Sequence, residues 1–182
     1  MKRKTAREIL ADSFRELMGH KSADKITIRE ITANCGYSMA TFYRQFRDKY
    51  DLIAWDYARR FRETVALEES ESLRDCFFRS AVMYGEQTEY LANLIRHTSG
   101  FYSFVENMKN IHFSMIRNFF LSRTGLGELS TKLEMYIRLY CSGTTDITCD
   151  WILGKFEAST EDLAEIYENS LPFPLRELLA EK

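Results

Sequence analysis

The residues most able to do chemistry lie between positions 27 and 51, and the chemistry they suggest is contact with DNA. This stretch reads as two short helices joined by a tight turn and followed at once by a third helix. Such an arrangement is a helix-turn-helix, whose second helix usually lies in the major groove of DNA. We therefore expect residues 39–46, the second helix of the motif, to face the groove.

Local signals predict where these helices begin and end. Thr27 and Glu30 have the spacing of a capping box, which satisfies free backbone N–H groups at a helix start. Gly36 can adopt the left-handed conformation that ends one helix, and Ser38 is a good N-cap for the next. The apolar residues at helical spacing are assigned to the core; they are Ile28, Ile31, Phe42 and Phe46.

The scarcity of glycine and proline predicts an all-α protein. Only 8 glycines and 2 prolines occur in 182 residues, and no alternating strand pattern is present. We expect about nine helices, at residues 5–18, 28–35, 39–46, 49–61, 73–84, 88–96, 101–122, 129–153 and 160–170, with a short piece at 175–180. Gly125, Gly127 and Gly154 are expected to break the longer helices.

Charge divides the chain into two parts. Residues 1–62 hold 14 Lys and Arg against 8 Asp and Glu, a net charge of +6, whereas residues 63–182 hold 11 against 19, a net charge of −8. A basic N-terminal part followed by an acidic remainder suits a protein that contacts DNA with its N-terminal part only. No apolar run approaches the roughly 18–20 residues of a membrane span, so the chain is expected to be cytoplasmic and without a membrane contact.

The residue types exclude the common enzymes. The sequence has no Gly-x-Ser-x-Gly, no glycine-rich phosphate loop and no His-Glu-x-x-His, and its three histidines lack metal-ligand spacing. We expect no catalytic residue, no metal and no cofactor. Cys141 and Cys149 are eight apart on one helical face, which suits either small core residues or a thiol pair that binds a soft metal or senses oxidants.

The order of these motifs resembles the N-terminal domain of TetR-family transcriptional regulators. The residues that carry the resemblance are Thr-Ile-Arg-Glu-Ile, Gly-Tyr-Ser, Ala-Thr-Phe-Tyr-Arg-Gln-Phe and Asp-Lys-Tyr-Asp-Leu-Ile, within roughly residues 5–57. The segment Phe-Arg-Asp-Lys-Tyr-Asp-Leu-Ile-Ala-Trp-Asp-Tyr further resembles a subgroup that includes the activator of a dihydroxyacetone kinase operon. The resemblance implies a helix-turn-helix DNA-binding domain over residues 1–48 and a helical regulatory and dimerisation domain over 49–182.

The resemblance also implies which residues touch DNA. In such a domain the start of the first motif helix touches the phosphate backbone or a base edge, and the start of the second motif helix faces the groove. Tyr43 bonds a phosphate, Arg44 and Gln45 reach base edges or phosphates, and Lys49 binds a phosphate. An arginine can read guanine and a glutamine suits adenine. Met39 departs from the polar or basic residue usual at this position in the family. At the N-terminus, Lys2, Arg3 and Lys4 would either lie along DNA phosphates or form a solvated tail. The implied DNA contacts are Thr27, Arg29, Ser38, Met39, Ala40, Thr41, Tyr43, Arg44, Gln45 and Lys49.

A palindromic double-stranded operator and a homodimer follow from the resemblance. The last two long helices, residues 129–153 and 160–170, would form a four-helix bundle with a second subunit. The family implies a repressor controlled by a small apolar effector; the subgroup implies an alternative, a regulator that responds to a kinase-like protein coactivator. No ligand-binding residue is predicted: the aromatic side chains of residues 84–140 suit core packing better than a ligand box, His97 is expected to cap a helix, and His112 suits either a pocket wall or the surface.

Overall fold

The computed structural model describes residues 4–65, 72–100 and 103–180, and these residues form helices and connecting loops without a strand. The all-α prediction is confirmed. About nine helices were expected, and the described residues form ten α-helices and one short 3-10 helix, because the piece near the C-terminus is a helix of its own. The contacts divide the chain into two compact units, Met1–Glu63 with Gln87–Phe104, and Thr64–Glu86 with Val105–Lys182.

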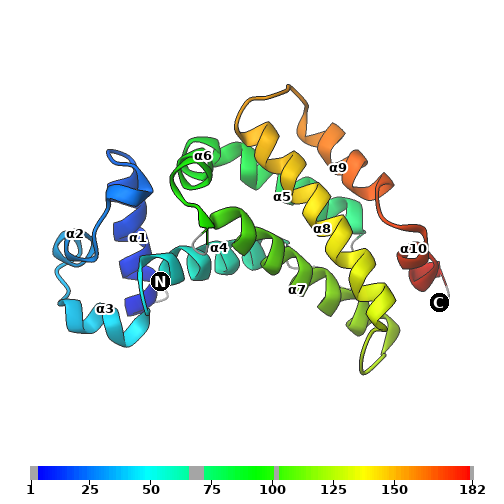
Figure 1. Cartoon of the computed structure of the whole chain (residues 1–182), viewed down its shortest axis with the longest axis horizontal. Coiled ribbons are helices and arrows are strands. Elements are labelled where there is room, and N and C mark those ends of the chain that lie inside the picture. Colours follow the sequence, from blue (N-terminus) through cyan, green and yellow to red (C-terminus); the bar gives the residue numbers. More distant parts are fainter. Residues whose placement is uncertain (1–3, 66–71, 101–102, 181–182) are drawn as a thin grey trace. The chain divides into compact units, whose positions relative to one another are not determined.

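The first unit contains the helix-turn-helix and one helix from later in the chain (Figure 1). Its elements are α1 (Ala6–Met18), η1 (Ala23–Lys25), α2 (Ile28–Asn34), α3 (Met39–Gln45), most of α4 (Lys49–Val65) and α6 (Thr88–His97). α1 packs against α2, α3 and α6, and η1 packs against α6. Two helix starts in this unit are capped by side chains: Thr5 caps α1, and the Asp48 carboxylate accepts hydrogen bonds from the N–H groups of Tyr50 and Asp51 at 2.9 Å.

Apolar residues at helical spacing form the core of this unit. The largest fully buried side chains include Leu10 and Phe14 of α1, Ile31 of α2, Phe42 of α3 and Leu52 of α4. The Ser13 hydroxyl donates to the Ile31 carbonyl at 2.7 Å, which satisfies a buried polar group where α1 meets α2. The core therefore fixes the helix-turn-helix against α1 and α4.

A buried carboxylate ties α1, α4 and α6 together. Asp56 of α4 is 1% exposed and accepts a hydrogen bond from Arg15 Nε of α1 at 2.6 Å. Arg15 also lies over the Tyr90 ring of α6, 4.0 Å from its centroid, and donates to Gln87 at 3.0 Å. Burial acts to raise the pKa of Asp56, but Arg15 and the other neighbouring arginines outweigh it, and the pKa lies below its usual value. Asp56 is therefore charged in the folded protein, and it holds Arg15 where that side chain contacts α6.

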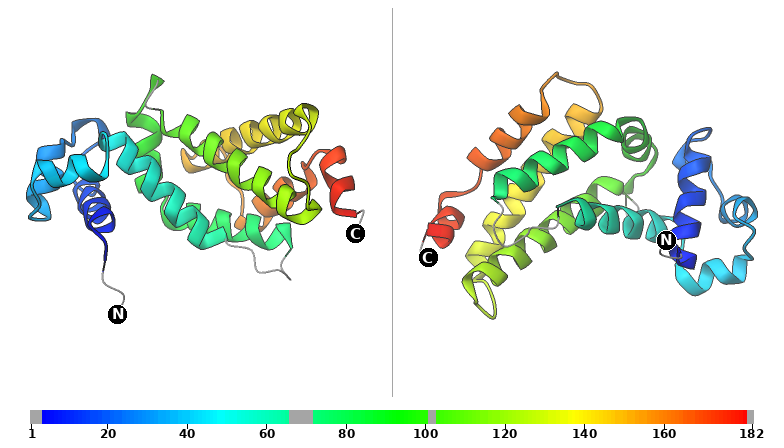
Figure 2. Two further views of the ribbon diagram at one scale, coloured as in Figure 1. Left: turned by 90° about the horizontal axis from the view of Figure 1, so that it is seen from below. Right: turned by 180° about the vertical axis from the view of Figure 1, so that it is seen from behind.

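The second unit consists of helices packed on a core of their own. Its elements are α5 (Leu73–Glu86), α7 (Phe104–Thr124, apart from its first residue), α8 (Thr131–Ile152), α9 (Thr160–Asn169) and α10 (Phe173–Ala180). Figure 2 shows α7 and α8 as neighbours that run in opposite directions, joined by a short loop. Gly125 and Gly154 have φ of +71°, a conformation that favours glycine, and each follows the end of a long helix as predicted. The helix expected from residue 101 begins at Phe104, and residues 101–102 lie outside the described part.

Two clusters fill this unit. One gathers Phe120, Ile137, Tyr140, Cys141 and Leu175 from α7, α8 and α10; the other gathers Ala81, Leu163 and Tyr167 where α5 packs on α9. The Tyr140 hydroxyl donates to the Tyr167 carbonyl at 2.7 Å, so a buried tyrosine links α8 to α9. Within the described ranges, no helix is both long enough and apolar enough to cross a bilayer.

Candidate nucleic-acid interface

The first helix of the motif starts at a reciprocal cap. The Thr27 hydroxyl accepts from the Glu30 N–H at 3.2 Å, and the Glu30 carboxylate accepts from the Thr27 N–H at 2.9 Å. Lys21 also pairs with Glu30, and the lysine, together with the two Thr27 hydrogen bonds, lowers the pKa of that carboxyl to about 2. Thr27 and Arg29 are exposed, so the side chains at the start of α2 are accessible to solvent.

Gly36 makes the turn between the two motif helices. Its φ is +73°, in the region that costs an L residue about 1 kcal/mol or more, and a Cβ there would meet no atom within 4 Å. The Tyr37 N–H donates to the Thr32 carbonyl at 2.9 Å and closes the turn. Backbone conformation, not crowding, is therefore the reason for glycine at this position.

The outer face of α3 carries a chain of polar groups. Ser38 caps the helix by accepting from the Thr41 N–H at 3.1 Å, and the two hydroxyls lie 3.0 Å apart. Arg44 Nη2 donates to the Thr41 hydroxyl at 3.1 Å, which holds the guanidinium along the same face. Met39 is 44% exposed and Tyr43 is 54% exposed. Both side chains are therefore accessible on the outer face of α3 and are not part of the core.

The inner face of α3 is fixed by packing and by one arginine. Phe42 is fully buried and Phe46 is 2% exposed, and their rings lie 5.8 Å apart. Arg7 of α1 donates to the Gln45 carbonyl at 2.8 Å and lies 4.9 Å from the centroid of the Phe46 ring. The last turn of α3 is thus anchored through its backbone, which leaves its outward side chains to other partners.

Lys49 has partners that the sequence did not suggest. Its Nζ donates to the carbonyls of Ala23, Asp24 and Ile26 at 2.8, 2.7 and 2.8 Å. Burial lowers the pKa of Lys49, although Asp24 and Glu30 act in the opposite direction. An ammonium has three donors, and all three are directed at the turn before α2 instead of outward.

A known protein family matches part of the first unit. The model of bacterial regulatory proteins of the tetR family matches residues 10–54, from α1 through the start of α4. This part of the chain is similar to a TetR-family DNA-binding domain. The matched span contains the whole helix-turn-helix, with the caps of α2 and α3 described above.

Solved structures extend the likeness beyond this domain to most of the chain. The dihydroxyacetone kinase operon activator DhaS is 18% identical with a TM-score of 0.62, and the match covers 94% of this chain and 96% of that one. A TetR transcriptional regulator from Rhodococcus sp. RHA1 is 17% identical with a TM-score of 0.66 and 97% coverage of both chains. One from Streptococcus agalactiae 2603V is 12% identical with a TM-score of 0.61, covering 91% and 93%. At these identities the likeness is one of fold. A comparison with curated protein sequences found no match.

All ten predicted DNA contacts lie in the first unit, and seven of them are exposed. Exposed are Thr27, Arg29, Ser38, Met39, Ala40, Tyr43 and Arg44; half-buried are Thr41, Gln45 and Lys49. Lys2 and Arg3 lie outside the described residues, and Lys4 pairs with Asp12 at 2.7 Å. Sequence reasoning missed Arg7 and Asn93, which hold backbone groups from other helices. Their partners are backbone atoms 38 and 70 residues away, which no local pattern encodes.

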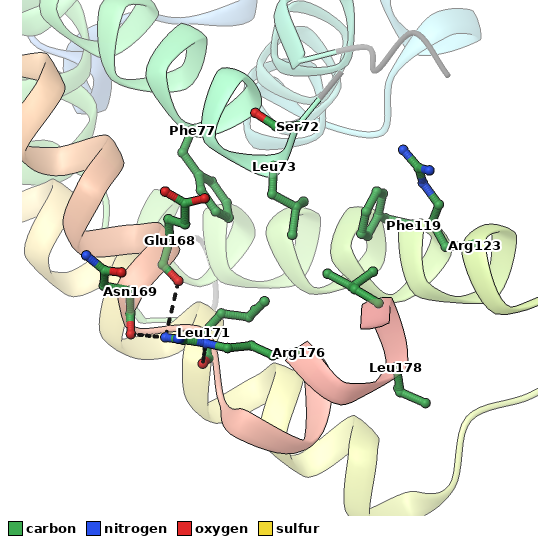
Figure 3. Close-up of a pocket in the computed structure, with 11 residues that line it drawn as sticks. Ser72, Leu73, Phe77, Phe119, Arg123, Glu168, Asn169, Leu171, Arg176 and Leu178 are labelled. Carbon is green, nitrogen blue, oxygen red and sulfur yellow. Dashed lines mark hydrogen bonds between the residues drawn. The ribbon is translucent and has the colours of Figure 1, made fainter. Parts of the chain in front are cut away.

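The second unit has an open pocket of about 700 Å³ (Figure 3). Its walls come from α5, α7, α9 and α10 and combine apolar side chains such as Phe77 and Phe119 with the charged side chains of Arg123, Glu168 and Arg176. Arg176 stands at one side and donates to the Leu171 carbonyl at 2.8 Å and to the Asn169 carbonyl, so it caps the end of α9 (Figure 3). The pocket opens to the surface of the second unit.

His112 is neither a surface residue nor a wall of this pocket. It is 8% exposed in the core of the second unit. Its Nε2 lies 3.1 Å from the Tyr84 hydroxyl and its Nδ1 lies 2.9 Å from the Thr145 hydroxyl. Burial lowers the pKa of His112 to about 4, so the imidazole is neutral near pH 7 and links α5, α7 and α8 through hydrogen bonds.

The cysteines have core positions. Cys76, Cys141 and Cys149 are buried and Cys35 is half-buried, and all four are free thiols. Across the described part of the chain, no three side chains of His, Cys, Asp or Glu gather closely enough to hold a metal ion. Burial raises the pKa of Cys141 and of Cys149 to about 12, which favours the unreactive thiol.

Proposed function

We propose that this chain is a TetR-family regulator, which binds a palindromic DNA operator as a homodimer and represses transcription until an effector binds. The observation that carries the proposal is α3, whose inner face is locked by Phe42, Phe46 and Arg7 while its outer face presents polar groups. A helix held in this way can enter the major groove without reorganising. The net positive charge of residues 1–62 also favours contact between this part of the chain and DNA phosphates.

The proposed contacts divide into base reading and backbone positioning. Arg44 and Gln45 read base edges, and Met39 meets an apolar edge such as a thymine methyl. Thr27, Arg29 and Tyr43 contact phosphates, which set register and affinity. The start of α3, with Ser38, Ala40 and Thr41, lies closest to the groove floor.

An exposed apolar stripe supports a dimer through α8 and α9. Met135 is 65% exposed and Leu139 is 72% exposed, one helical turn apart on α8, and Ile147 two turns on is 38% exposed. Ile166 of α9 is 43% exposed. A stripe of this kind costs free energy in water, and a second copy related by two-fold symmetry would cover it. Two recognition helices would then match the two halves of a palindrome.

The pocket of the second unit supports control by a small effector. Such a molecule would have to prefer one of two arrangements of the dimer in order to change DNA affinity. A second candidate is a regulator or activator that responds to a protein coactivator. It is favoured by the similarity to the dihydroxyacetone kinase operon activator and by the openness of the pocket, which does not enclose a ligand.

The test is selection of bound DNA from a random pool with purified protein, followed by affinity measurements across a salt series. We expect an enriched palindrome whose affinity falls steeply with salt, because phosphate contacts release counterions. Arg44→Ala should lose the preference for the palindrome while keeping the oligomeric state. A folded protein that enriches no sequence would contradict the proposal.

A further inference from the structure

The turn that leads into α2 is held from two sides within the first unit. From α4, Lys49 donates to the carbonyls of Ala23, Asp24 and Ile26, in and just after η1, at 2.7–2.8 Å. From α6, the Asn93 side chain accepts from the Ala23 N–H at 3.0 Å and donates to the Lys21 carbonyl at 3.1 Å. Ala23 is fully buried and Ile26 is 1% exposed, so the turn is also anchored by its apolar side chains.

This turn ends where the proposed backbone contacts begin. The Ile26 carbonyl accepts from Lys49, and the next residue, Thr27, is the N-cap of α2. Arg29 follows in the first turn of that helix. The position of the turn therefore determines where the Thr27 hydroxyl, the free N–H groups of α2 and the Arg29 guanidinium meet a phosphate.

The same geometry leaves Lys49 without a spare donor. The three carbonyls converge on one ammonium group, which matches the three N–H bonds of that group. A phosphate contact would require Lys49 to give up one of them and to leave a backbone carbonyl without its partner.

We propose that Lys49 and Asn93 are positioning residues that fix the turn before α2, and that Lys49 does not itself bind a DNA phosphate. This inference rests on the proposed DNA-binding function. α4 and α6 then act on operator affinity through one short piece of backbone, since each helix supplies a side chain that holds it.

Two lysine variants separate positioning from phosphate binding. Lys49→Met removes the charge and the donors; Lys49→Arg keeps the charge, but a planar guanidinium cannot replace one ammonium at three converging carbonyls. Lys25→Met is the matched control, because Lys25 is an exposed lysine of the same turn. Affinity for the selected palindrome is measured for each variant over a salt series.

We expect Lys49→Met and Lys49→Arg each to weaken operator binding about tenfold beyond Lys25→Met, with the same slope of log affinity against log salt as the wild type. Asn93→Ala should behave likewise, and its effect should be less than additive with Lys49→Met because both hold one turn. Arg29→Ala should lower the slope by about 0.9, the change for one phosphate contact.

A slope lowered by about 0.9 in Lys49→Met and restored in Lys49→Arg would overturn the inference. Full affinity in Asn93→Ala or in Lys49→Met would overturn it as well. Amide hydrogen exchange over residues 22–30 provides a readout that needs no DNA. Lys49→Met and Asn93→Ala should each exchange faster in this segment than the wild type, and unchanged protection would contradict the positioning role. A wild-type protein that selects no DNA, with the turn still protected by Lys49, would count against the proposed function and not against the positioning role.

Discussion

The Nε of Arg15 lies 2.6 Å from a carboxylate oxygen of Asp56, and this pair joins α1 to α4 beneath the aromatic ring of Tyr90. Asp56 also accepts from Arg59 at 3.1 Å and from Arg60 at 3.2 Å. One buried acid therefore neutralises part of the charge of three arginines in the most basic part of the chain.

Asp56→Asn should destabilise the protein by about 3 kcal/mol, because it leaves partly buried guanidinium groups without their counter-charge. The free energy of unfolding in urea at pH 7 provides the measurement. Glu89→Gln is the control, since Glu89 is an exposed acid on α6. Equal stability of the two variants would show that the pair contributes nothing.

The Asp56 carboxyl should also make the stability of the fold fall at acid pH. Its folded pKa is lowered, so its contribution to stability is complete above the unfolded pKa of about 3.9 and is lost as the pH falls through the folded pKa. We expect Asp56→Asn to remove acid sensitivity below about pH 4 and to leave the profile between pH 5 and 7 unchanged.

His112 should make the protein less stable as the pH falls from 7 to 5. Its folded pKa of about 4 is below the ordinary histidine value of 6.5, so between these two pH values the unfolded state binds a proton that the folded state does not. The contribution to stability is complete above pH 6.5 and falls by up to about 2 kcal/mol at pH 5. His112→Gln should flatten this part of the profile in urea unfolding, whereas His20→Gln, at an exposed site, should not. A wild-type profile without slope in this range would refute the assignment.

Thr27 and Thr5 offer a matched test of DNA contact. Each is the N-cap of a helix and forms a capping box with a glutamate three residues later. Replacement by alanine should cost about 1 kcal/mol of stability at either position. Only Thr27→Ala should weaken binding to the selected operator after correction for folded fraction, as measured by fluorescence anisotropy. Equal loss of affinity in the two variants would remove Thr27 from the contact set.

Leu139→Asp should dissociate the proposed dimer. The side chain is 72% exposed on α8, so the substitution leaves the fold of a single chain intact while it places charges at the two-fold interface. Light scattering after gel filtration should give the mass of one chain. Phe173→Asp is the control, because Phe173 is 70% exposed on α10 and lies outside the proposed interface. A dimeric Leu139→Asp protein would place the interface elsewhere.

The thiols should differ sharply in reactivity. Cys141 and Cys149 are 1% and 6% exposed and their pKa values are raised to about 12, so an aromatic disulfide reagent at pH 7.5 should leave them unmodified until the protein unfolds. Half-buried Cys35 should react first, and Cys35→Ser should remove the fast phase. Rapid modification of Cys141 in native protein would revive an oxidant-sensing role.

The sequence allowed the helices and their caps to be predicted because these depend on neighbours. Thr27, Ser38 and Asp48 each bond to a backbone N–H two or three residues away, and Gly36 acts through its own φ. The partners of Lys49 lie 23–26 residues away, and a lysine at a helix start suits a phosphate as well as a carbonyl. Its geometry could therefore not be read from spacing. The same holds for His112, whose burial depends on helices that pack from distant parts of the chain.

The position of α6 in the first unit has a consequence for chimeric proteins. The chain leaves this unit after Glu63, forms α5, and returns with Gln87–Phe104 to supply Tyr90 and Asn93. A graft that exchanged only the first 63 residues between two relatives would pair a foreign Arg15 and a foreign turn with the recipient's α6. A transferable DNA-binding unit of this protein therefore consists of two segments, Met1–Glu63 and Gln87–Phe104. An exchange of operator specificity between two relatives has to include both segments.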